Sequence, residues 1–572
     1  MLNDSVMKNM TTNEQQGVTL FYNTFRGFAE FQQNVVMAAY VLLKVSEDDS
    51  ICTDTLEDYL RTSGEKGERA TQIQNAMSNI WNSVVQLRGK ISSETLKTIV
   101  LYDDCGSRMT VSETPVGLSK LTFLLMNIKA GDQIADFCTG YGSVIREFSR
   151  LEPGASYYGN DICSASAVIA EMRAELLGGS IEIKQEDLFE MEGKAQYFDA
   201  AFSNYPFGMR ARDKRDAGGE YVRSLIDENS VFAKGGTSMD WIFNEVVRGM
   251  VKESGRAVCI MTNGSTLNTM DKAAREYFIK SGAVEAVIAL PGRLFEGTVI
   301  PTSMIVLSHG NKDVMMVDAR ELCVKGRRQN IITEENAVEI FEACQRETEY
   351  SKRISLSELE ANEYVLYPER YQEQEITIQH GVEFGTVIKG ITRGAQLRAS
   401  QLDDLVSVEP TSNQYLMLGN IQNGVIDNEL PYLTQIDESQ KKYCLKHHDL
   451  IISKSGAPFK VAVAEVEDGM EILATGNLYI IELDETKVDP YYIKAFLESD
   501  AGSCELNRIV VGATIPNIGV AQLKTITVPV PPMEEQAAIA NQYRGAIAEV
   551  KELRQKIEVV QERMKHLFDD SI

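Results

Sequence analysis

One polar run could hold a flat ring that carries an amino group. It is Asn204-Tyr205-Pro206-Phe207, which directly follows the mostly apolar stretch FDAAFS at residues 198–203. The Asn204 side-chain oxygen and the main-chain carbonyl of residue 205 can accept hydrogen bonds from the two N–H bonds of one amine. Pro206 would stiffen the loop, and Phe207 offers a face on which the ring could stack. An ordinary turn would also explain these residue types, so the rest of the chain has to decide.

Three further stretches place glycine or an acid where a ligand could bind. DFCTGYGS carries Gly140 and Gly142, which allow a tight turn just after Asp136. Asp161, in YGNDI, can accept hydrogen bonds from two ribose hydroxyls, and Asp187, in QEDLF, is placed to reach an adenine amino group. Each has a simpler explanation, a strand–helix turn or a helix N-cap. In this order along the chain they describe a nucleoside cofactor that lies across strand ends.

The expected cofactor carries no phosphate. The sequence has no Gly-Lys-Ser or Gly-Lys-Thr loop of the kind that binds phosphates, so S-adenosylmethionine fits the pattern better than a nucleotide. Its sulfonium is a strong electrophile, so the attacking amine needs no general base with a tuned pKa. The presence of only five histidines agrees with this chemistry. Nine cysteines without metal-ligand spacing predict reduced thiols and no metal site.

These residues need strands to position them. From about residue 115 the sequence alternates between apolar runs, Gly-rich or polar turns and helical segments. The runs at 132–137, 156–161, 197–203, 255–262 and 284–290 are the expected strands. Strands that alternate with helices predict an α/β fold with a doubly wound, Rossmann-like sheet. In such sheets ligands bind at the carboxyl ends of the strands, which is where the suspected residues occur.

The remaining chain divides by texture. Residues 1–110 are expected to form a helical domain with no chemistry of its own, and residues 111–345 the α/β domain. The charged stretch 346–380 lacks a strong apolar pattern and is predicted to be a linker. A β-rich texture over 381–535 predicts a second, α+β domain, and residues 536–572 are expected to form one long helix.

The final helix carries a seam of apolar side chains. Its positions alternate by four and three residues, which is the a/d pattern of a coiled coil held for about four heptads. A single amphipathic helix that packs on its own domain is the alternative. The seam comprises Ile539, Tyr543, Ala546, Val550, Leu553, Ile557, Val560, Met564 and Leu567.

The composition sets limits on the partners. The chain has 572 residues, 44% of them hydrophobic, and a net charge of -26 with a pI near 4.8. No apolar run has membrane-spanning length and no signal-peptide core is visible, so we expect a cytoplasmic protein with no membrane partner. The acidity alone argues against a nucleic-acid partner. A locally basic cleft would answer that objection, because the local field decides binding.

The α/β region resembles a known family. SNYPFG resembles the Asn-Pro-Pro-Phe/Tyr signature of methyltransferases that act on adenine N6, and residues 110–320 resemble the modification subunits of type I restriction–modification systems. The resemblance implies a methyltransferase domain over 111–345 that uses S-adenosylmethionine. It implies catalytic roles for Asn204, Tyr205, Pro206 and Phe207, and cofactor-binding roles for Thr114, Pro115, Asp136, Gly140, Gly142, Asp161 and Asp187. Tyr205 departs from the family's proline, and we expect that position to contribute its carbonyl and not its ring.

The second domain is similar to one half of a specificity subunit of the same systems. The phrases GNIQNGVID, HDLIISKSGAPFKVAV and GATIPNIGVAQLKTITVPVPPMEEQ occur once each, in the expected order. The resemblance implies a target recognition domain over 381–535 fused to the modification subunit, followed by a spacer helix. Double-stranded DNA is the implied partner, with a homodimer through the helix and separate specificity or restriction subunits as further partners. Candidate DNA contacts are Lys454, Lys460, Arg508, Asn517 and Lys524.

The leading hypothesis is therefore a site-specific DNA adenine-N6 methyltransferase of a restriction–modification system. One alternative is a DNA-binding or methylation-sensing scaffold subunit of a restriction or phage-defence complex, with weak or no catalysis. Tyr205 leaves room for it. Another alternative, an RNA or protein methyltransferase, would explain the loop at 204–207 but not the specificity-like domain.

Overall fold

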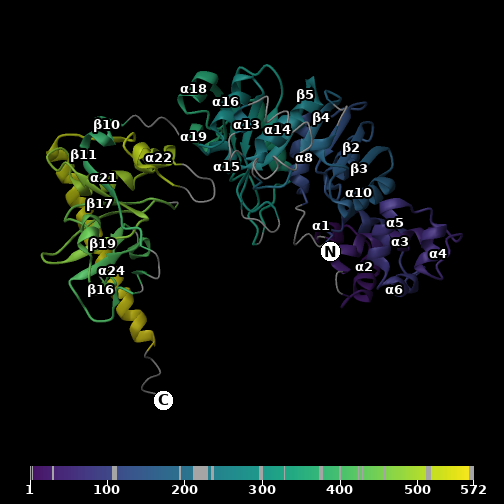
Figure 1. The fold of residues 1–572 in the computed structure, drawn as a ribbon, viewed down its shortest axis with the longest axis horizontal. Helices are drawn as coiled ribbons and strands as arrows, with labels where there is room; N and C mark the ends of the chain where they lie inside the picture. Colours follow the sequence, from purple (N-terminus) through teal and green to yellow (C-terminus); the bar gives the residue numbers. More distant parts are fainter. Residues whose placement is uncertain are drawn as a thin grey trace, which may run out of the picture. The chain divides into compact units, whose positions relative to one another are not determined.

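The chain folds into two compact units, Met1–Gln372 and Glu373–Ile572, each described here by itself. The structure is a computed structural model (Figure 1). It describes residues 2, 4–28, 31–105, 113–191, 195–209, 230–233, 238–295, 300–327, 329–372, 378–397, 401–402, 404–422, 424–427, 429–456, 459–510 and 517–565.

A large mixed sheet forms the centre of the first unit. Its described strands number nine, in the order β3-β2-β1-β4-β5-β7-β6-β8-β9. The run from β3 to β5 is parallel, whereas β7 is antiparallel to both of its neighbours. The strands are β1 (Gln133–Phe137), β2 (Ser156–Asp161), β3 (Ser180–Gln185), β4 (Phe198–Ser203), β5 (Val251–Thr262), β6 (Val284–Ala289), β7 (Thr302–Leu307), β8 (Asp313–Asp318) and β9 (Ser351–Ser355).

Helices cover both faces of this sheet, which confirms the doubly wound prediction. One buried cluster packs α8, α9 and α17 against the sheet, and another packs α14 and α16 against the opposite side chains of the same strands. The central strands are near-continuous apolar runs, as strands that are buried on both faces must be. The helices and 3-10 turn of this part are α8 (Val116–Met126), α9 (Ser143–Leu151), α10 (Ser164–Leu177), η1 (Leu188–Glu190), α13 (Ser230–Ala233), α14 (Met239–Met250), α15 (Asn263–Leu267), α16 (Lys272–Lys280) and α17 (Glu334–Gln345).

The N-terminal residues are helical, as predicted. Their apolar stripes close a separate core that also includes Val168, Ile169 and Met172 of α10, so these helices pack on α10, which itself contacts β2 and β3. Thr11 begins α2 with a capping box in which it exchanges hydrogen bonds with Glu14. The helices are α1 (Asp4–Lys8), α2 (Thr12–Thr24), α3 (Phe31–Glu47), α4 (Leu56–Thr62), α5 (Gly67–Met77), α6 (Trp81–Gln86) and α7 (Ser93–Tyr102).

Most of the predicted linker, residues 346–372, is part of the first unit, so that prediction was wrong there. Residues 351–355 form β9, which pairs with β8 at the sheet edge. Helices α18 (Leu356–Ala361) and α19 (Glu369–Gln372) follow it, and Leu359 and Leu366 are fully buried in the core. An edge strand buries few side chains, and β9 buries only Ser351 and Ile354. Its apolar signal was therefore too weak to read.

The second unit mixes strands with helices, as the sequence predicted. Its described strands form the sheets β11-β20-β17-β18 and β12-β16-β13-β19 and the pairs β10-β21 and β14-β15. The strands are β10 (Gly381–Glu383), β11 (Ile388–Arg393), β12 (Val406–Ser407), β13 (Asn413–Leu416), β14 (Ile421–Gln422), β15 (Val425–Ile426), β16 (Tyr432–Leu433), β17 (Leu450–Ser453), β18 (Val461–Val463), β19 (Glu471–Ala474), β20 (Leu478–Leu483) and β21 (Thr527–Pro529). The helical segments are η2 (Phe384–Val387), η3 (Leu418–Asn420), η4 (Glu438–Tyr443), α21 (Pro490–Leu497), α22 (Asp500–Arg508) and α23 (Val520–Leu523).

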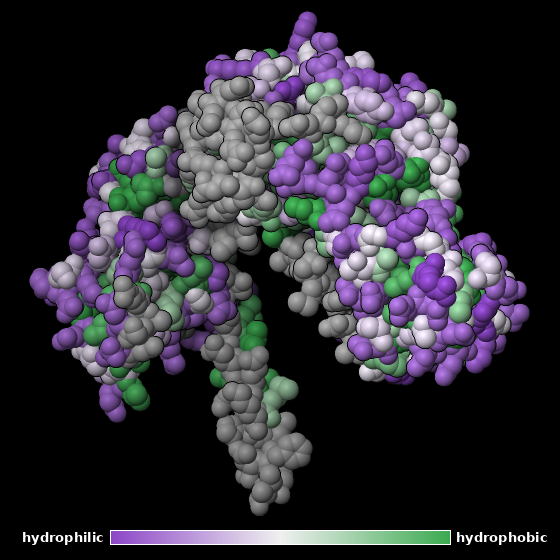
Figure 2. Space-filling model, turned by 45° about the vertical axis from the view of Figure 1, so that its right-hand side comes forward, coloured by the Kyte–Doolittle hydropathy of each residue, from purple (hydrophilic) through white to green (hydrophobic). Residues whose placement is uncertain are grey.

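The chain ends in the long helix α24 (Met533–Lys565), whose two halves differ. In the first half Gln536 and Ala540 are fully buried, and Tyr543 and Ile547 pack against the unit's core beside α21. In the second half the apolar side chains are exposed, and green side chains are visible along that end of the helix in Figure 2. The predicted seam is therefore not uniform, because Tyr543 faces its own domain. Leu567 lies outside the described residues.

No helix in the described part of the chain combines the length and the apolar character that crossing a bilayer requires.

Candidate active site

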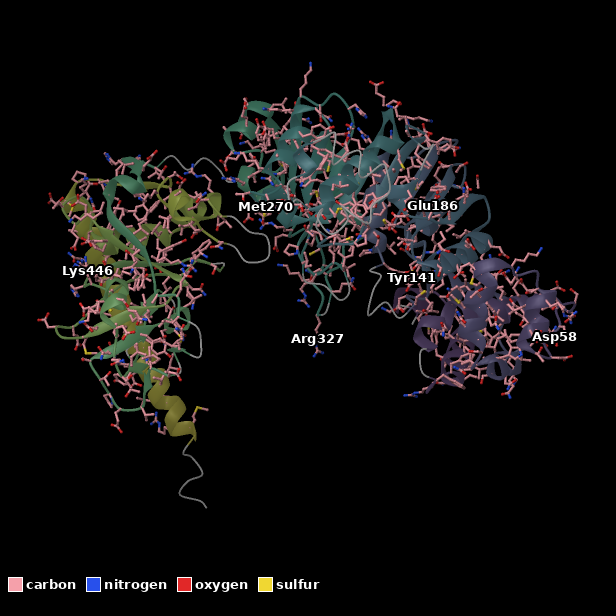
Figure 3. The ribbon with its side chains drawn as sticks, in the orientation of Figure 1. Asp58, Tyr141, Glu186, Met270, Arg327 and Lys446 are labelled. Atoms are coloured by element: carbon pink, nitrogen blue, oxygen red, sulfur yellow. The ribbon has the colours of Figure 1, made fainter. Side chains whose placement is uncertain are left out.

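The predicted site residues lie at the carboxyl ends of four neighbouring strands of the large sheet. β3, β2, β1 and β4 are adjacent and parallel, so their carboxyl ends lie side by side. Asp136 lies near the end of β1, Asp161 ends β2, Asp187 follows β3 and Asn204 follows β4. The chain leaves β1 in one direction and reaches β4 on the other side, which makes these strand ends a topological switch point. The labels of Tyr141 and Glu186 in Figure 3 mark two of the loops at these strand ends.

The glycine loop after β1 is fastened to β2. Thr139 N–H donates to the carbonyl of Asn160 over 2.8 Å, and Gly140 N–H donates to Oδ2 of Asp161 over 2.9 Å. Gly140 and Gly142 have φ of +56° and +76°, in the left-handed region that glycine adopts without strain. A Cβ on Gly142 would also lie 3.2 Å from the Cβ of Ala170, so α10 packs closely there.

Asp161 does not cap a helix, which was its simpler explanation. α10 begins at Ser164 with Cys163 as N-cap, and Cys163 N–H donates to Oδ1 of Asp161 over 2.9 Å. Each carboxylate oxygen therefore receives one backbone N–H and keeps a lone pair for another donor. Burial raises the pKa of Asp161, and the two backbone donors oppose that rise.

Asp136 is the most deeply buried acid of the group, at 2% exposure. The Thr139 hydroxyl donates to its Oδ2 over 2.6 Å. Burial in this apolar strand end raises the pKa of Asp136 to about 7, because a charged carboxylate loses its hydration there. The Asp136 side chain therefore holds the start of the glycine loop through its hydrogen bond with Thr139.

Asp187 closes the turn after β3. Its Oδ1 accepts the Phe189 N–H over 2.9 Å and starts the short turn η1. Glu186 N–H donates to the Asp161 carbonyl over 3.1 Å, and the Asn160 amide donates to the Glu186 carbonyl over the same distance. The tips of β2 and β3 are thus tied together, which fixes the spacing between Asp161 and Asp187.

Asn204 is held by the segment that precedes α8. Its Nδ2 donates to Oγ1 of Thr114 over 3.1 Å, and Thr114 is buried. Pro115 is the N-cap of α8. With Nδ2 engaged, Oδ1 is the atom of Asn204 left to accept a hydrogen bond from a ligand amine. The structure thereby joins a predicted cofactor-side residue, Thr114, to a predicted catalytic one.

The remaining residues of the loop point in different directions. Pro206 is exposed, and Phe207 is half-buried with its ring edge-to-face on Phe295 at a centroid distance of 5.7 Å. Tyr205 turns inward and is only 1% exposed. Its hydroxyl donates to Oδ1 of Asn244 over 3.0 Å. The Tyr205 ring therefore lies inside the protein, whereas the side chain of the next residue, Pro206, is exposed.

Sequence reasoning missed Arg173, which contacts both the glycine loop and the segment that precedes Thr114. The guanidinium is 1% exposed and donates to the Val100 carbonyl over 2.9 Å, to the Tyr141 carbonyl over 2.9 Å and to Glu113 over 3.0 Å. It also donates to the carbonyl of Asp103. One buried cation thus joins the helical region, the glycine loop and the residue before Thr114. An arginine inside a helix pattern carries no local sign of this role.

The predicted DNA contacts do not form one group in the second unit. Lys454 and Asn517 are neighbours, because Ile518 N–H donates to the Lys454 carbonyl over 3.0 Å. Lys460 is engaged internally: its ammonium donates to the carbonyls of Leu418 and Ile421 over 2.9 and 2.6 Å.

The other two candidates lie elsewhere on the same unit. Arg508 pairs with Glu505 over 2.7 Å, and Lys524 is exposed at the end of α23. The Lys460 ammonium is thus engaged inside the unit, whereas the side chain of Lys524 is exposed.

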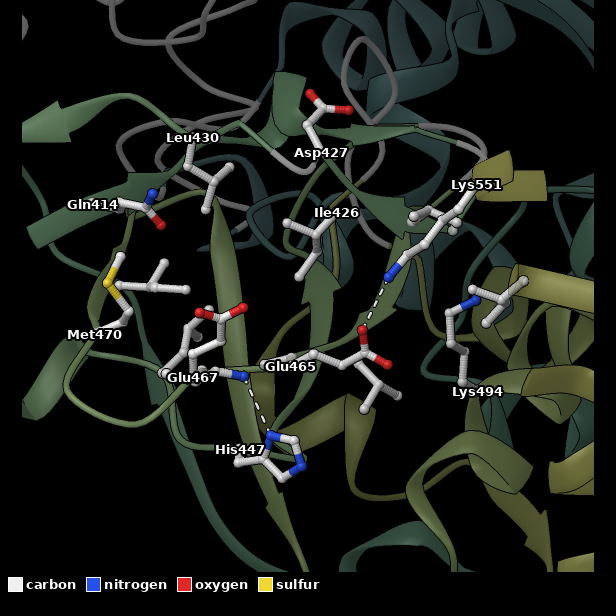
Figure 4. A pocket seen from close by; sticks show the side chains of 18 of the residues that line it. Gln414, Ile426, Asp427, Leu430, His447, Glu465, Glu467, Met470, Lys494 and Lys551 are labelled. Atoms are coloured by element: carbon white, nitrogen blue, oxygen red, sulfur yellow. Dashed lines mark hydrogen bonds and ion pairs between the residues drawn. The ribbon is translucent and has the colours of Figure 1, made fainter. Parts of the chain in front are cut away.

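A separate cavity of about 470 Å³ opens in the second unit between the strands and α24 (Figure 4). Its wall carries Glu465, Glu467 and Asp427, and Lys551 of α24 reaches across to Glu465 over 2.9 Å. The same wall also carries Lys494 and His447, so its three carboxylates face two lysine side chains.

The comparisons with known proteins divide the chain at a similar place. Residues 106–379 match the family described as N-6 DNA Methylase, and residues 406–558 match the Type I restriction modification DNA specificity domain.

Individual relatives agree with each half. The type I restriction enzyme MjaVIII methylase subunit of Methanocaldococcus jannaschii is 22% identical over 280 residues, 44% of this chain and 48% of that protein. The StySPI specificity subunit of Salmonella potsdam is 25% identical over 185 residues, 32% of this chain and 38% of that protein. The chain thus spans less than half the length of each of these relatives.

Solved structures of low sequence identity also match. A type I restriction–modification methyltransferase subunit from Streptococcus thermophilus gives a TM-score of 0.48 at 15% identity, covering 64% of this chain and 98% of that chain. The type IIG restriction endonuclease BpuSI gives 0.49 at 12% identity, covering 94% and 75%. The family matches confirm the resemblance found in the sequence. This protein joins an N-6 DNA methylase domain, within residues 106–379, to a type I restriction modification DNA specificity domain, within residues 406–558.

Proposed function

We propose that this protein is a site-specific DNA adenine-N6 methyltransferase of a restriction–modification system. The observation that carries the proposal is the position of Asn204 at the end of β4, beside the strand ends that hold Asp136, Asp161 and Asp187. All four residues lie inside the region that matches the N-6 DNA methylase family. A second domain of the specificity type in the same chain supports DNA as the substrate.

The strand-end residues fit S-adenosylmethionine, which when bound would supply an electrophilic methyl group. Asp161 has one free lone pair on each oxygen, aimed from the tip of β2, and suits two ribose hydroxyls. The loop at Gly140 has a left-handed backbone with no side chain, so a ligand can approach its main chain closely. Asp187 would accept from the adenine amino group of the cofactor.

The loop after β4 would hold the target base. Because the target amine is inaccessible in a duplex, the adenine has to be flipped out of the stack. Oδ1 of Asn204 and the carbonyl of Tyr205 would accept from its two N–H bonds and orient the nitrogen toward the methyl group. Phe207 would supply a face for stacking, and its contact with Phe295 fixes the ring plane. The proton can leave after methyl transfer, so the loop needs no general base.

We further propose that two copies associate through the end of α24. Leu553, Ile557, Val560 and Met564 follow a/d spacing and are 50%, 56%, 43% and 63% exposed. The described part of the chain leaves this row of apolar side chains exposed, and a second helix with the same row could cover it in a coiled coil. A symmetric dimer would place two recognition domains on one DNA and would read a two-part, palindromic site. Separate specificity or restriction subunits are compatible with this arrangement.

The test is methyl transfer to DNA by the purified protein, combined with single-molecule methylation sequencing of DNA from cells with and without the gene. The wild-type protein should produce N6-methyladenine in one bipartite motif. Asn204→Ala should lose at least about 100-fold in kcat while DNA affinity stays unchanged, because one transition-state acceptor is removed.

Asn311→Ala is a matched control. Asn311 lies in the turn after β7, at the opposite end of the strands from Asn204. It should transfer methyl groups at the wild-type rate. Sequence-specific DNA binding without any methyl transfer by the wild-type protein would favour a methylation-sensing scaffold instead.

A further inference from the structure

The side chain of Tyr205 is built into the protein behind the catalytic loop. Its ring stacks on Phe243 of α14 with a centroid distance of 4.4 Å and an interplanar angle of 10°. Its hydroxyl lies 3.0 Å from Oδ1 of Asn244 and 3.3 Å from the Asp240 carbonyl. Tyr205, Phe243 and Asn244 are all at least 96% buried. The residue is therefore fixed at both its ring face and its hydroxyl.

The helix that receives Tyr205 is itself firmly anchored. Asp240, at the start of α14, accepts from the Thr262 N–H over 3.0 Å, from the Thr262 hydroxyl over 2.8 Å and from the Ser265 hydroxyl over 2.7 Å. Trp241 donates its indole N–H to the Ser265 carbonyl over 3.1 Å. α14 is thereby attached to the end of β5, the strand next to β4. A side chain held by this helix has little freedom to move the loop.

The same stack extends to the cofactor side. Phe243 also contacts the ring of Phe189, with a centroid distance of 4.7 Å and an interplanar angle of 42°. Phe189 donates its N–H to Asp187 over 2.9 Å. Phe243 thus contacts the ring of Tyr205, whose main-chain carbonyl is the proposed acceptor, and also Phe189 in the turn that contains Asp187. These two loops are separated along the sheet by β2 and β1, and the aromatic stack is a direct connection between them.

We propose that the Tyr205 side chain is a positioning group: through Asn244 and Phe243 it sets the direction of the residue 205 carbonyl and couples the base-binding loop to the Asp187 turn. The inference rests on the proposed function and deepens it. It adds a role for the side chain to the sequence-based expectation that this position contributes its carbonyl. A backbone carbonyl can be aimed by a ring constraint, as proline would provide, or by a side chain anchored elsewhere. This chain uses the second means, and the anchor also reaches the cofactor side.

Replacement of Tyr205 distinguishes the two means. Tyr205→Phe keeps the stack and removes the hydroxyl, and should lower kcat about 10-fold while KM for S-adenosylmethionine changes less than about twofold. Tyr205→Pro restores a stiff ring but removes both anchors, and should lower kcat further, by about 100-fold. A carbonyl-only role predicts the opposite, wild-type or faster turnover for Tyr205→Pro, and that result would overturn the proposal.

Tyr157→Phe is the control for a lost buried hydrogen bond. Tyr157 is 3% exposed and donates to the carbonyls of Phe148 and Glu152, at the opposite end of β2. It should lower the melting temperature to an extent similar to Tyr205→Phe and leave kcat unchanged. Equal effects of the two variants on kcat would show that Tyr205 acts only through stability.

The coupling is tested at Phe243. Phe243→Leu should lower kcat and also weaken cofactor binding by about 10-fold in calorimetry, which needs no turnover. Phe278→Leu, equally buried and packed on Trp241 at 5.0 Å, is the stability control and should leave cofactor binding unchanged. Unchanged cofactor affinity in Phe243→Leu would refute the coupling. If the wild-type protein neither binds S-adenosylmethionine nor transfers methyl groups, the proposed function itself fails.

Discussion

Residue spacing predicted both the strand-end site and the apolar seam of α24. The side chains of the first have partners within the chain, whereas those at the end of the second are exposed. At the strand ends each acid already has a donor inside the chain, such as Gly140 N–H for Asp161 and the Thr139 hydroxyl for Asp136. At the end of α24 the apolar side chains have no cover within the described part of their own chain, and Ile557 is 56% exposed.

The difference teaches which contacts a single chain has to provide. A site for a small ligand must be rigid before the ligand arrives, so its carboxylates and loops are held by internal hydrogen bonds. An interface can leave its surface open, because the partner completes it. The first half of α24 is held by contacts inside its own unit, and the second half exposes its apolar side chains, with the change near Lys551.

The largest expected effect breaks the open side of this comparison. Replacement of Leu553 and Ile557 by lysine should convert a dimer to monomers, with self-association weakened at least about 1,000-fold. Each apolar side chain buried in the seam contributes about 1.5–3 kcal/mol, and each chain of the dimer would bury four of them. Sedimentation velocity at several concentrations measures this. Gln555→Lys, an exposed position on the same helix, is the control for added charge. A dimer that survives the double replacement would contradict the coiled-coil proposal.

An intermediate effect concerns the closed side, at Asp136. Its carboxyl stays protonated in the folded protein up to about pH 7, whereas in the unfolded chain it ionises near its ordinary value of 3.8. The folded state therefore binds an extra proton between these values, and the stability that the carboxyl contributes falls as the pH rises through about 7. Between about pH 5 and about pH 8 the free energy of unfolding of wild type relative to Asp136→Asn should fall by about 2–3 kcal/mol.

Urea denaturation at both pH values measures this difference. Asp54→Asn, at an exposed position, controls for the loss of one carboxyl group. A difference between wild type and Asp136→Asn that does not change with pH would show that burial does not raise the Asp136 pKa in the folded protein.

The smallest expected effect lies at the boundary between the two halves of α24. Lys551→Met removes the contact with Glu465, whose side chain is 55% exposed while that of Lys551 is 31% exposed. A pair this close to water should contribute less than about 1 kcal/mol to the free energy of unfolding. Thermal denaturation checks it. A loss above about 2 kcal/mol would mean that charge pairs, and not Ala540 and its apolar neighbours, hold the helix to its domain.

Sequence reasoning located several strands of the large sheet well because strands that are buried on both faces leave strong apolar runs. β1, β2, β4 and β6 lie where the runs predicted them. It failed at β9, where an edge strand leaves little apolar signal, and within α24, where one heptad pattern covers a first half that packs on its own unit and a second half that is exposed. Arg173 and the inward turn of Tyr205 were invisible for another reason. Their partners are distant in sequence, and only the fold brings them together.

Arg173 has a consequence for how the protein opens. Its guanidinium holds the end of the N-terminal helices through Val100, the glycine loop through Tyr141 and the approach to Thr114 through Glu113. Any fluctuation that frees one of these segments leaves a buried cation without some of its acceptors, which is costly. We therefore expect the helical region and the strand-end loops to open together, so that amide exchange in the N-terminal helices would report on the order of the strand-end site.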